Sequence, residues 1–418
     1  MQDNSISIFK KAGIVGLAVL LPLSASFADF QIKTKGGIKV FDPADDTYSF
    51  ELSGALKFDE TLFRTKNINR NNFPSGANLR AADLSFSGGI AKNWSYSFDT
   101  EYGSGGEVTI GCAHAKYAGF KNMSFLIGQF YFPFGLENSN SSKWTGFLEK
   151  SMPTSAFSPP KGLGLNYQVW KGDWAFSIAL ANPEAHANSN ENSDQDSKYG
   201  SDRFNYGARL VYHPIAEKEQ VLHTGISAFS TNIDSETRLG APLRDKQFAS
   251  KPEAKSRNVQ NLLDTGKLQI RGYSTAGTEL AWMNGPLLVQ AEYMWANARQ
   301  VHETAKRLKF SGWQTQASYV LTGEVHDYNQ KMGSFGKVTP EADTGAWEIA
   351  FRHSFLNLND KNVQAGSAHN TSFGLSWYMN ENIRWMANYV HVDKTHGANS
   401  VHRKGKMDIV GARVQVVW

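Results

Sequence analysis

From residue 48 onward, apolar and polar residues alternate with a period of two, and this alternation limits the possible folds more than any other feature. In segment 94–102, aromatic and other large side chains at even positions alternate with Ser95, Ser97, Asp99 and Glu101. Alternation over eight or more residues indicates a β-strand with one apolar and one polar face. No window of useful length shows the 3.6-residue period of an amphipathic helix, so we expect an all-β protein.

About sixteen segments carry this strand pattern. They are 48–64, 78–91, 94–103, 108–120, 123–135, 161–171, 173–184, 204–216, 221–233, 272–285, 286–299, 308–322, 345–358, 368–380, 382–393 and 407–418.

Short and long links alternate between these segments. The short links are Lys92-Asn93, Lys121-Asn122, Lys171-Gly172, Asn284-Gly285 and Glu381, and the long polar links are 136–160, 185–203, 234–271 and 394–406. Short turns on one side and long loops on the other are typical of an up-and-down barrel in the outer membrane. Link 323–344 departs from the pattern, because it is long although it falls on the side of the short turns.

A soluble barrel could also alternate, but its packed interior would have to bury the many charges on the polar faces without water. A wide, water-filled lumen removes that cost, and about sixteen strands suit an open channel. The aromatic residues lie on the apolar faces toward strand ends, as interfacial girdles require. The sequence therefore predicts a membrane-spanning antiparallel up-and-down β-barrel.

Residues 1–28 have the pattern of a secretory signal peptide. Lys10 and Lys11 precede an apolar run from Ala12 to Leu23, and Ser26-Phe27-Ala28 provides a small-x-small cleavage site. The alternative is a buried N-terminal helix. We expect a cleaved signal peptide at 1–28, a short N-terminal periplasmic segment at 29–47 and a porin-type barrel at 48–418, located in the bacterial outer membrane.

The last segment has an alternating outward face formed by Val410, Ala412, Val414, Val416 and Trp418. It resembles the terminal strand of outer-membrane proteins, which ends in an aromatic residue. That resemblance implies recognition by the barrel-assembly machinery.

Residues 128–137 read Gly-Gln-Phe-Tyr-Phe-Pro-Phe-Gly-Leu-Glu, and 141–149 read Ser-Ser-Lys-Trp-Thr-Gly-Phe-Leu-Glu. Together with Tyr-Val-Leu-Thr-Gly-Glu at 319–324, Gly-Ala-Trp-Glu at 345–348, and Trp-Tyr at 377–378 leading to Asn-Tyr-Val at 388–390, they resemble the phosphate-selective porin O and P family. The resemblance implies a sixteen-stranded homotrimeric channel. It also implies that loop 136–160 folds inward and constricts the pore, and that link 323–344 folds into the periplasmic side of the lumen.

The charged residues bear on selectivity. Where the family has Arg-Arg-Ala-Arg, this chain has Arg80-Ala81-Ala82-Asp83, which keeps one arginine and introduces an acid, and the resemblance places Lys143, with Lys150 nearby, among the family's loop lysines. Parity assigns more acids than bases to the lumen wall, which is therefore no ladder of cations. The acids are Glu51, Asp59, Asp83, Asp99, Glu101, Glu279, Glu292 and Glu348, and the bases are Lys57, Lys116, Arg209, Arg352, Arg384 and Arg413.

The candidate constriction and permeation residues are Lys143, Lys150, Glu149, Lys57, Arg80, Lys116, Arg209, Arg352, Arg384 and Arg413. Segments 234–271, 299–309 and 393–406 are each net positive. They either gather anions at the outer mouth or contact lipopolysaccharide phosphates and solvent.

We therefore expect a diffusion porin for small hydrophilic solutes and ions, with a preference for anions such as phosphate. Its other partners would be outer-membrane lipid and lipopolysaccharide. The alternative is an outer-membrane barrel with a structural, adhesive or enzymatic role. A single cysteine and widely spaced histidines lead us to expect no metal site and no cofactor. We expect neither catalysis nor nucleic-acid binding.

Overall fold

The computed structural model describes residues 30–34, 36–43, 47–103, 108–183, 204–232, 245–301, 307–395 and 404–418. The signal peptide expected at 1–28 lies outside the described residues.

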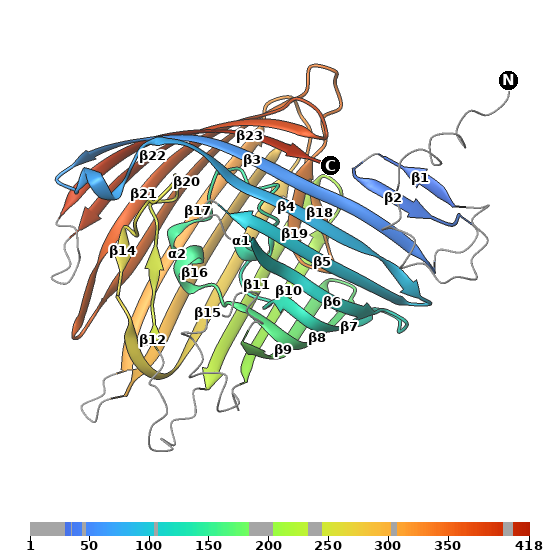
Figure 1. Ribbon diagram of the computed structural model, residues 1–418, viewed down its shortest axis with the longest axis horizontal. Coiled ribbons are helices and arrows are strands. Elements are labelled where there is room, and N and C mark those ends of the chain that lie inside the picture. The colour runs from blue at the N-terminus through green and yellow to red at the C-terminus, as the bar shows by residue number, and fades with distance from the viewer. Residues whose placement is uncertain are drawn as a thin grey trace.

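Sixteen antiparallel strands form a closed barrel in which each strand pairs with its neighbours along the chain (Figure 1). The barrel strands are β3 (Ser49–Lys66), β4 (Gly76–Ala91), β5 (Trp94–Gly103), β6 (Val108–Tyr117), β7 (Met123–Tyr131), β8 (Lys161–Lys171), β9 (Trp174–Pro183), β10 (Asn205–Ala216), β11 (Gln220–Asn232), β15 (Leu268–Asn284), β16 (Leu287–Gln300), β17 (Arg307–Val320), β20 (Ala346–Asp360), β21 (Val363–Tyr378), β22 (Ile383–Thr395) and β23 (Gly405–Val417). Each corresponds to one predicted segment, so the predicted fold class is confirmed.

The barrel closes where β23 pairs with β3, from Lys406 opposite Lys66 to Val417 opposite Ala55. Beyond that ladder, Trp418 N–H donates to Gly54 O at 3.2 Å, and Gly54 N–H donates to Trp418 O at 3.0 Å. A Cβ atom on Gly54 would lie 2.4 Å from the Trp418 ring, so only glycine leaves room for the terminal indole at this seam.

The short turns are tight because residues with left-handed backbone conformations occupy them. Asn93 has φ 65° and Asn122 has φ 61°, and asparagine tolerates this region better than most residues. Gly172 and Gly285, both with φ 54°, occupy the equivalent turns after β8 and β15.

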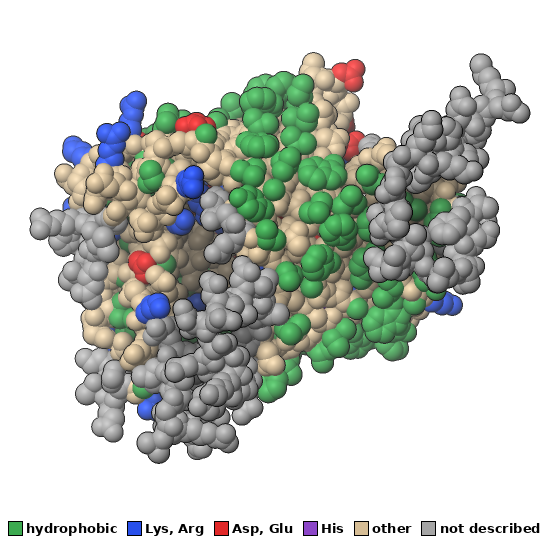
Figure 2. Space-filling view, in the orientation of Figure 1, with side chains coloured by type: hydrophobic (Ala, Val, Ile, Leu, Met, Phe, Trp, Pro, Cys, Tyr) green, Lys and Arg blue, Asp and Glu red, His purple; other side chains and the backbone are tan. Residues whose placement is uncertain are grey.

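The two faces of the wall differ as the alternation predicts. Outward-facing large apolar side chains such as Leu62, Ile178, Leu280 and Trp282 are exposed, and green apolar side chains cover much of the outer wall in Figure 2. Exposed apolar side chains of this extent on every side are expected for a wall that contacts lipid.

Segments from both ends of the barrel enter its lumen. From one end come the constriction loop (residues 136–160), with helices α1 (Leu136–Ser139) and α2 (Met152–Phe157), and the segment that carries β12 (Asp245–Lys246), β13 (Ala249–Ser250) and β14 (Leu263–Asp264). From the other comes a hairpin formed by β18 (His326–Asn329) and β19 (Ser334–Val338), which we call the lumen hairpin. None of the described residues forms a helix long and apolar enough to cross a bilayer.

A second short hairpin precedes the barrel. Strand β1 (Gln31–Lys33) pairs with β2 (Ile38–Phe41), and β2 pairs with the first residues of β3, from Ser49 to Leu52. This hairpin lies beside the end of the barrel in Figure 1, within the segment 29–47 that the sequence sets apart from the barrel.

Candidate functional site: the constricted lumen

The constriction loop begins at a backbone clamp. Gly135 has φ 66°, which turns the next amides toward β16: Leu136 N–H donates to Glu292 Oε1 at 2.6 Å, and Glu137 N–H donates to Glu292 Oε2 at 3.0 Å. A Cβ on Gly135 would approach Glu292 Oε1 to 3.0 Å. The structure therefore explains the glycine in the Pro-Phe-Gly-Leu-Glu motif, because both the left-handed conformation at residue 135 and its close contact with Glu292 favour glycine.

Arg352 of β20 lies at the centre of the loop's anchorage. Its Nη1 donates to Glu137 Oε1 at 3.0 Å, and its Nη2 donates to Glu253 Oε2 at 2.6 Å and to Glu149 O at 3.0 Å. The Arg352 side chain is 1% exposed. Breaking such a buried pair leaves uncompensated charge, so these contacts hold the loop against the wall.

Glu253 reaches this centre from the long external segment. Its carboxylate accepts hydrogen bonds from the Met152 amide at 3.0 Å and from the Ser354 hydroxyl, and Glu253 itself has φ 58°. The left-handed conformation is unfavourable for glutamate, and the buried contacts offset that cost. Sequence reasoning counted this residue among the charges of an external loop, and nothing in its local pattern signals an inward position.

Further anchors lie along β22, β23 and β3. Arg413 donates to Asp59 at 2.7 and 2.8 Å, and Arg384 donates to Thr145 O at 2.9 Å. Arg384 Nη2 also lies 3.5 Å from Glu348 Oε2. These pairs are buried between the loop and the wall rather than facing open water.

Glu149 lies where several cations meet. Its carboxylate accepts two hydrogen bonds from Arg80, at 2.5 and 3.1 Å, and lies 3.2 Å from Lys255 Nζ and 3.5 Å from Arg413 Nη2. Burial alone would raise the pKa of Glu149, but Arg80 and Lys255 outweigh it and hold that pKa well below its usual range. Glu149 therefore stays charged and partly neutralises the bases around it.

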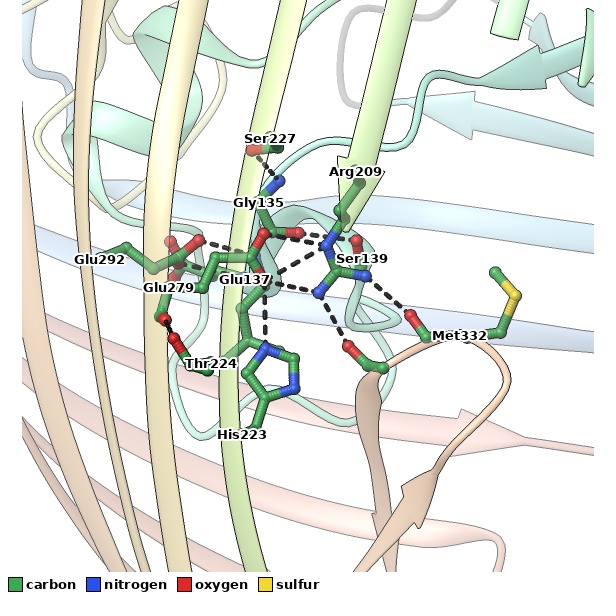
Figure 3. Close-up of polar contacts among 12 residues, drawn as sticks. Gly135, Glu137, Ser139, Arg209, His223, Thr224, Ser227, Glu279, Glu292 and Met332 are labelled. Atoms are coloured by element: carbon green, nitrogen blue, oxygen red, sulfur yellow. Dashed lines mark hydrogen bonds and ion pairs between the residues drawn. The ribbon is translucent and has the colours of Figure 1, made fainter. Parts of the chain in front are cut away.

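A latch formed by residues of β10, β11 and β15 holds the tip of the lumen hairpin. Arg209 donates to Glu279 at 2.6 to 3.2 Å and also to the carbonyl oxygens of Met332 at 2.7 Å and Gly333 at 2.8 Å. His223 lies between Glu279 Oε2, at 3.2 Å, and the Tyr328 hydroxyl, at 2.8 Å. Figure 3 shows Arg209 between the Glu279 carboxylate and the hairpin backbone. The link expected to enter the lumen is thus fixed to the wall at β10, β11 and β15.

A cavity of about 600 Å³ remains between the constriction loop and the wall from β3 to β10. Its charged lining residues are Lys57, Arg80, Asp83, Asp99, Glu101, Lys143, Lys150, Arg209 and Lys331. The loop contributes a run of amide and hydroxyl side chains from Asn138 to Ser142. The cavity is the space that the loop leaves beside these strands, and its lining also includes apolar residues such as Phe130 and Phe132.

The structure distributes the candidate residues over several environments. Lys57, Arg80, Lys143, Lys150 and Arg209 line the cavity, whereas Arg352, Arg384 and Arg413 lie in the buried anchors outside its lining.

The remaining two candidates are Glu149 and Lys116. Glu149 pairs with Arg80 behind the cavity, and Lys116 of β6 lies near enough to Lys331 to interact electrostatically. Their roles in permeation remain predictions.

Lys331 is a cavity-lining base that sequence reasoning missed. It lies in the anomalous link 323–344, at the tip of the lumen hairpin between β18 and β19. The signal that could have found it was the expectation that this link enters the lumen, combined with its lysines.

The described residues contain no group of three or more His, Cys, Asp or Glu side chains placed to hold a metal ion.

A closed antiparallel barrel with an apolar outside, a polar lumen and a loop folded into that lumen defines a porin. The chain belongs to the family described as phosphate-selective porin O and P, whose profile matches residues 50–418. It is an outer-membrane porin, a passive diffusion channel for small hydrophilic solutes and ions.

The chain is 29% identical to Porin O of Pseudomonas aeruginosa over 416 residues, which cover 90% of this chain and 92% of that protein. Among solved structures, the fold is similar to the trimer form of in-vitro folded OmpT, an outer membrane protein of Vibrio cholerae. The TM-score is 0.53 and the identity 10%, with 89% of this chain and 100% of that chain covered.

The fold is also similar to an anion-selective porin from Comamonas acidovorans. The TM-score is 0.51 and the identity 9%, with 89% of this chain and 100% of that chain covered. At these identities, the structural similarity concerns the fold.

Proposed function

We propose that this porin favours small anions, phosphate among them, and that its preference is moderate. The observation that carries the proposal is the charge of the cavity lining, where six bases face three acids. Several acids that parity placed on the wall, among them Glu279, Glu292 and Glu348, are buried in the anchors and the latch and do not line the cavity. The passage is therefore more basic than the wall as a whole.

The preference is moderate because part of this positive charge is already paired. Lys57 Nζ lies 3.7 Å from Asp83, Arg80 pairs with Glu149, and Arg209 pairs with Glu279. The remaining lysines act on a passing ion across water, where two unit charges about 4 Å apart interact by about 1 kcal/mol in bulk and about 4 kcal/mol near a protein surface.

Lys143 and Lys150 are the loop residues we expect to act most directly on an anion. Both line the cavity, and the Lys150 ammonium donates to Asn138 Oδ1 at 2.9 Å and to Asn138 O at 3.3 Å. Burial lowers the pKa of Lys150, so its charge is more easily lost at alkaline pH than that of a fully solvated lysine.

Planar-bilayer recordings test the proposal. We expect the reversal potential under a KCl gradient to show anion preference, and phosphate to compete with the chloride current. Lys143→Ala should lower the anion-to-cation permeability ratio by about two-fold and weaken the phosphate block, while Lys143→Arg keeps both. A clear cation preference of the wild-type pore would overturn the proposal.

We propose that the channel is not an enzyme, and that it assembles as a homotrimer. Family membership and the inward loop support the channel, and the solved trimer with a similar fold supports the assembly. Native mass spectrometry of the detergent-solubilised protein tests the trimer, and a monomer as the sole species would contradict it.

We further propose export with cleavage after Ala28, a periplasmic segment at 29–47 and a barrel at 48–418. The small-x-small pattern at 26–28 supports the cleavage, and insertion by the barrel-assembly machinery is consistent with the aromatic terminal strand. The mass of the mature protein extracted from outer membranes tests the cleavage site.

We propose lipopolysaccharide as a partner of exposed basic residues in the external segments. Among the described residues, Lys406 has a side chain that is 56% exposed. Lys255 of segment 234–271 instead turns inward to Glu149, so this segment does not act as a simple solvated funnel. Binding of purified lipopolysaccharide to the wild type and to Lys406→Gln tests this contact.

A further inference from the structure

A second cavity lies beside the lumen hairpin. It measures about 960 Å³ and is lined by the constriction loop, the end of β8 and the hairpin. Lys337 and Trp170 line this second cavity only. The first cavity lies along β3 to β10, and the second adjoins it at the lumen hairpin.

The two cavities share three lining residues, Ser139, Ser141 and Lys331. Two of them belong to the constriction loop, and the third belongs to the lumen hairpin. The junction therefore lies between a segment that enters from the outside and a segment that enters from the periplasmic side.

The hydrogen-bond donors at this junction are the Ser141 hydroxyl and the Lys331 ammonium, because the Ser139 hydroxyl already donates to Gly135 O at 2.6 Å. Ser139 and Ser141 carry hydroxyls, and Lys331 carries an exposed ammonium whose Nζ lies 5.1 Å from the centre of the Trp170 ring. A cation over an aromatic face is attracted to it, which restrains the lysine at the junction. An ammonium together with one hydroxyl donor suits a small oxyanion.

The backbone beneath Lys331 is held from several sides. The carbonyl oxygen of the preceding Gln330 accepts a hydrogen bond from His213 Nε2 at 3.2 Å, and the Gln330 side chain donates to Ala216 O at 2.7 Å. The following Met332 carbonyl accepts from Arg209 at 2.7 Å. The backbone on both sides of Lys331 is therefore held in place, while the Lys331 side chain remains exposed.

We propose that Ser139, Ser141 and Lys331 form the exit neck of the channel, and that Lys331 is a specificity-determining residue there. Its charge sets how readily a small oxyanion passes from the constriction cavity to the periplasmic cavity. This inference rests on the proposed anion preference and adds a second selective point, distinct from Lys143 and Lys150 on the loop.

Lys337 provides a matched control on the same hairpin. It lines the second cavity but not the first, and its ammonium lies 3.7 Å from Glu381 Oε2. A change of charge at Lys337 alters the same hairpin and the same cavity without touching the neck.

The test compares Lys331→Gln, Lys331→Glu and Lys331→Arg with Lys337→Gln and Lys337→Glu in planar bilayers under a KCl gradient. We expect the anion-to-cation permeability ratio to fall about two-fold for Lys331→Gln and about four-fold for Lys331→Glu, and to stay unchanged for Lys331→Arg. The Lys337 variants should stay close to the wild type.

A steric variant tests the position without relying on charge. Lys331→Trp should lower the single-channel conductance about two-fold by narrowing the neck, whereas Lys337→Trp should not. Heat-modifiable migration in gels confirms that each variant is folded.

The outcomes separate the two proposals. A cation-preferring wild type contradicts the proposed function, yet Lys331→Glu would still shift the ratio more than Lys337→Glu if the neck exists. Equal effects at Lys331 and Lys337, with an anion-preferring wild type, would overturn the neck and leave the proposed function standing.

Discussion

The lumen has two regions that carry the same kinds of charged side chain in different settings. In the anchored region, Arg352 and Arg413 are at most 3% exposed, and each is hydrogen-bonded to a carboxylate. In the open region along β3 to β10, Glu101 is 43% exposed and its nearest base, Arg80, lies 3.6 Å away. The difference arises from whether the constriction loop covers the wall.

This contrast teaches that an inward-facing charge is not by itself a permeation residue. A covered pair is dry, so its energy contributes to holding the loop, and removing one partner is costly. An uncovered charge is solvated and contributes little to stability, but it remains available to a passing ion.

The substitution that we expect to have the largest effect in the anchored region is Arg352→Ala. It removes the partner of both Glu137 and Glu253, and we expect a loss of about 3–5 kcal/mol together with release of the constriction loop. Thermal unfolding in detergent and single-channel noise measure the two effects. Lys116→Ala, an inward-facing base on the open side, should change stability by no more than about 0.5 kcal/mol. Equal destabilisation by both variants would refute the division into two regions.

Removal of the latch should have a smaller, local effect. Arg209→Ala deletes the bonds to Met332 O and Gly333 O and leaves Glu279 without its arginine, so we expect about 2–4 kcal/mol of destabilisation concentrated in the lumen hairpin. Faster hydrogen exchange at 326–338 and tryptic cleavage after Lys331 measure it. Unchanged exchange in the hairpin would show that Arg209 does not hold it.

Glu149→Gln should sharpen the contrast between the two regions. It removes a negative charge that pairs with bases near the open region, so their positive charge acts more strongly on a passing ion. The substitution removes the carboxylate that pairs with Arg80, Lys255 and Arg413, while its amide oxygen still accepts one hydrogen bond. We expect the anion-to-cation permeability ratio to rise about two-fold in reversal-potential measurements. A fall in this ratio would mean that Glu149 does not mask these bases.

Lowering the pH should weaken the ion pairs of Glu149, and we expect this to have the smallest effect on stability. Because the pKa of Glu149 is lowered in the folded state, its contribution to stability is present above the unfolded value, about 4.3, and is lost as the pH falls through the folded value. Thermal stability should therefore show no Glu149-dependent change from pH 7 to 5 and a decline below about pH 4. Glu149→Gln should lack that part of the decline, and identical pH profiles would contradict the assignment.

The alternation of residues was sufficient to predict the barrel, because a period of two records which side of a strand contacts lipid. The first predicted segment, 48–64, agrees with β3 (Ser49–Lys66) to within two residues at each end. The links were equally informative: Asn93 and Gly285 occupy turns that require a left-handed backbone, and such residues are visible in a sequence.

The site was less predictable because its contacts join residues far apart in the chain. Parity correctly turned Arg352 inward, but only the fold shows that Glu137 and Glu253 cover it. Lys331 was missed for the same reason, since a long link has no strand pattern that assigns its side chains to a face.

Asn140 joins the two segments that obstruct the lumen. Its Oδ1 accepts a hydrogen bond from Phe335 N–H at 2.9 Å, and its Nδ2 lies 3.5 Å from Gln290 Oε1 on the wall. One amide therefore links the insert from the extracellular side to the insert from the periplasmic side. A displacement of either insert would stretch this hydrogen bond, so the two inserts are mechanically coupled at Asn140.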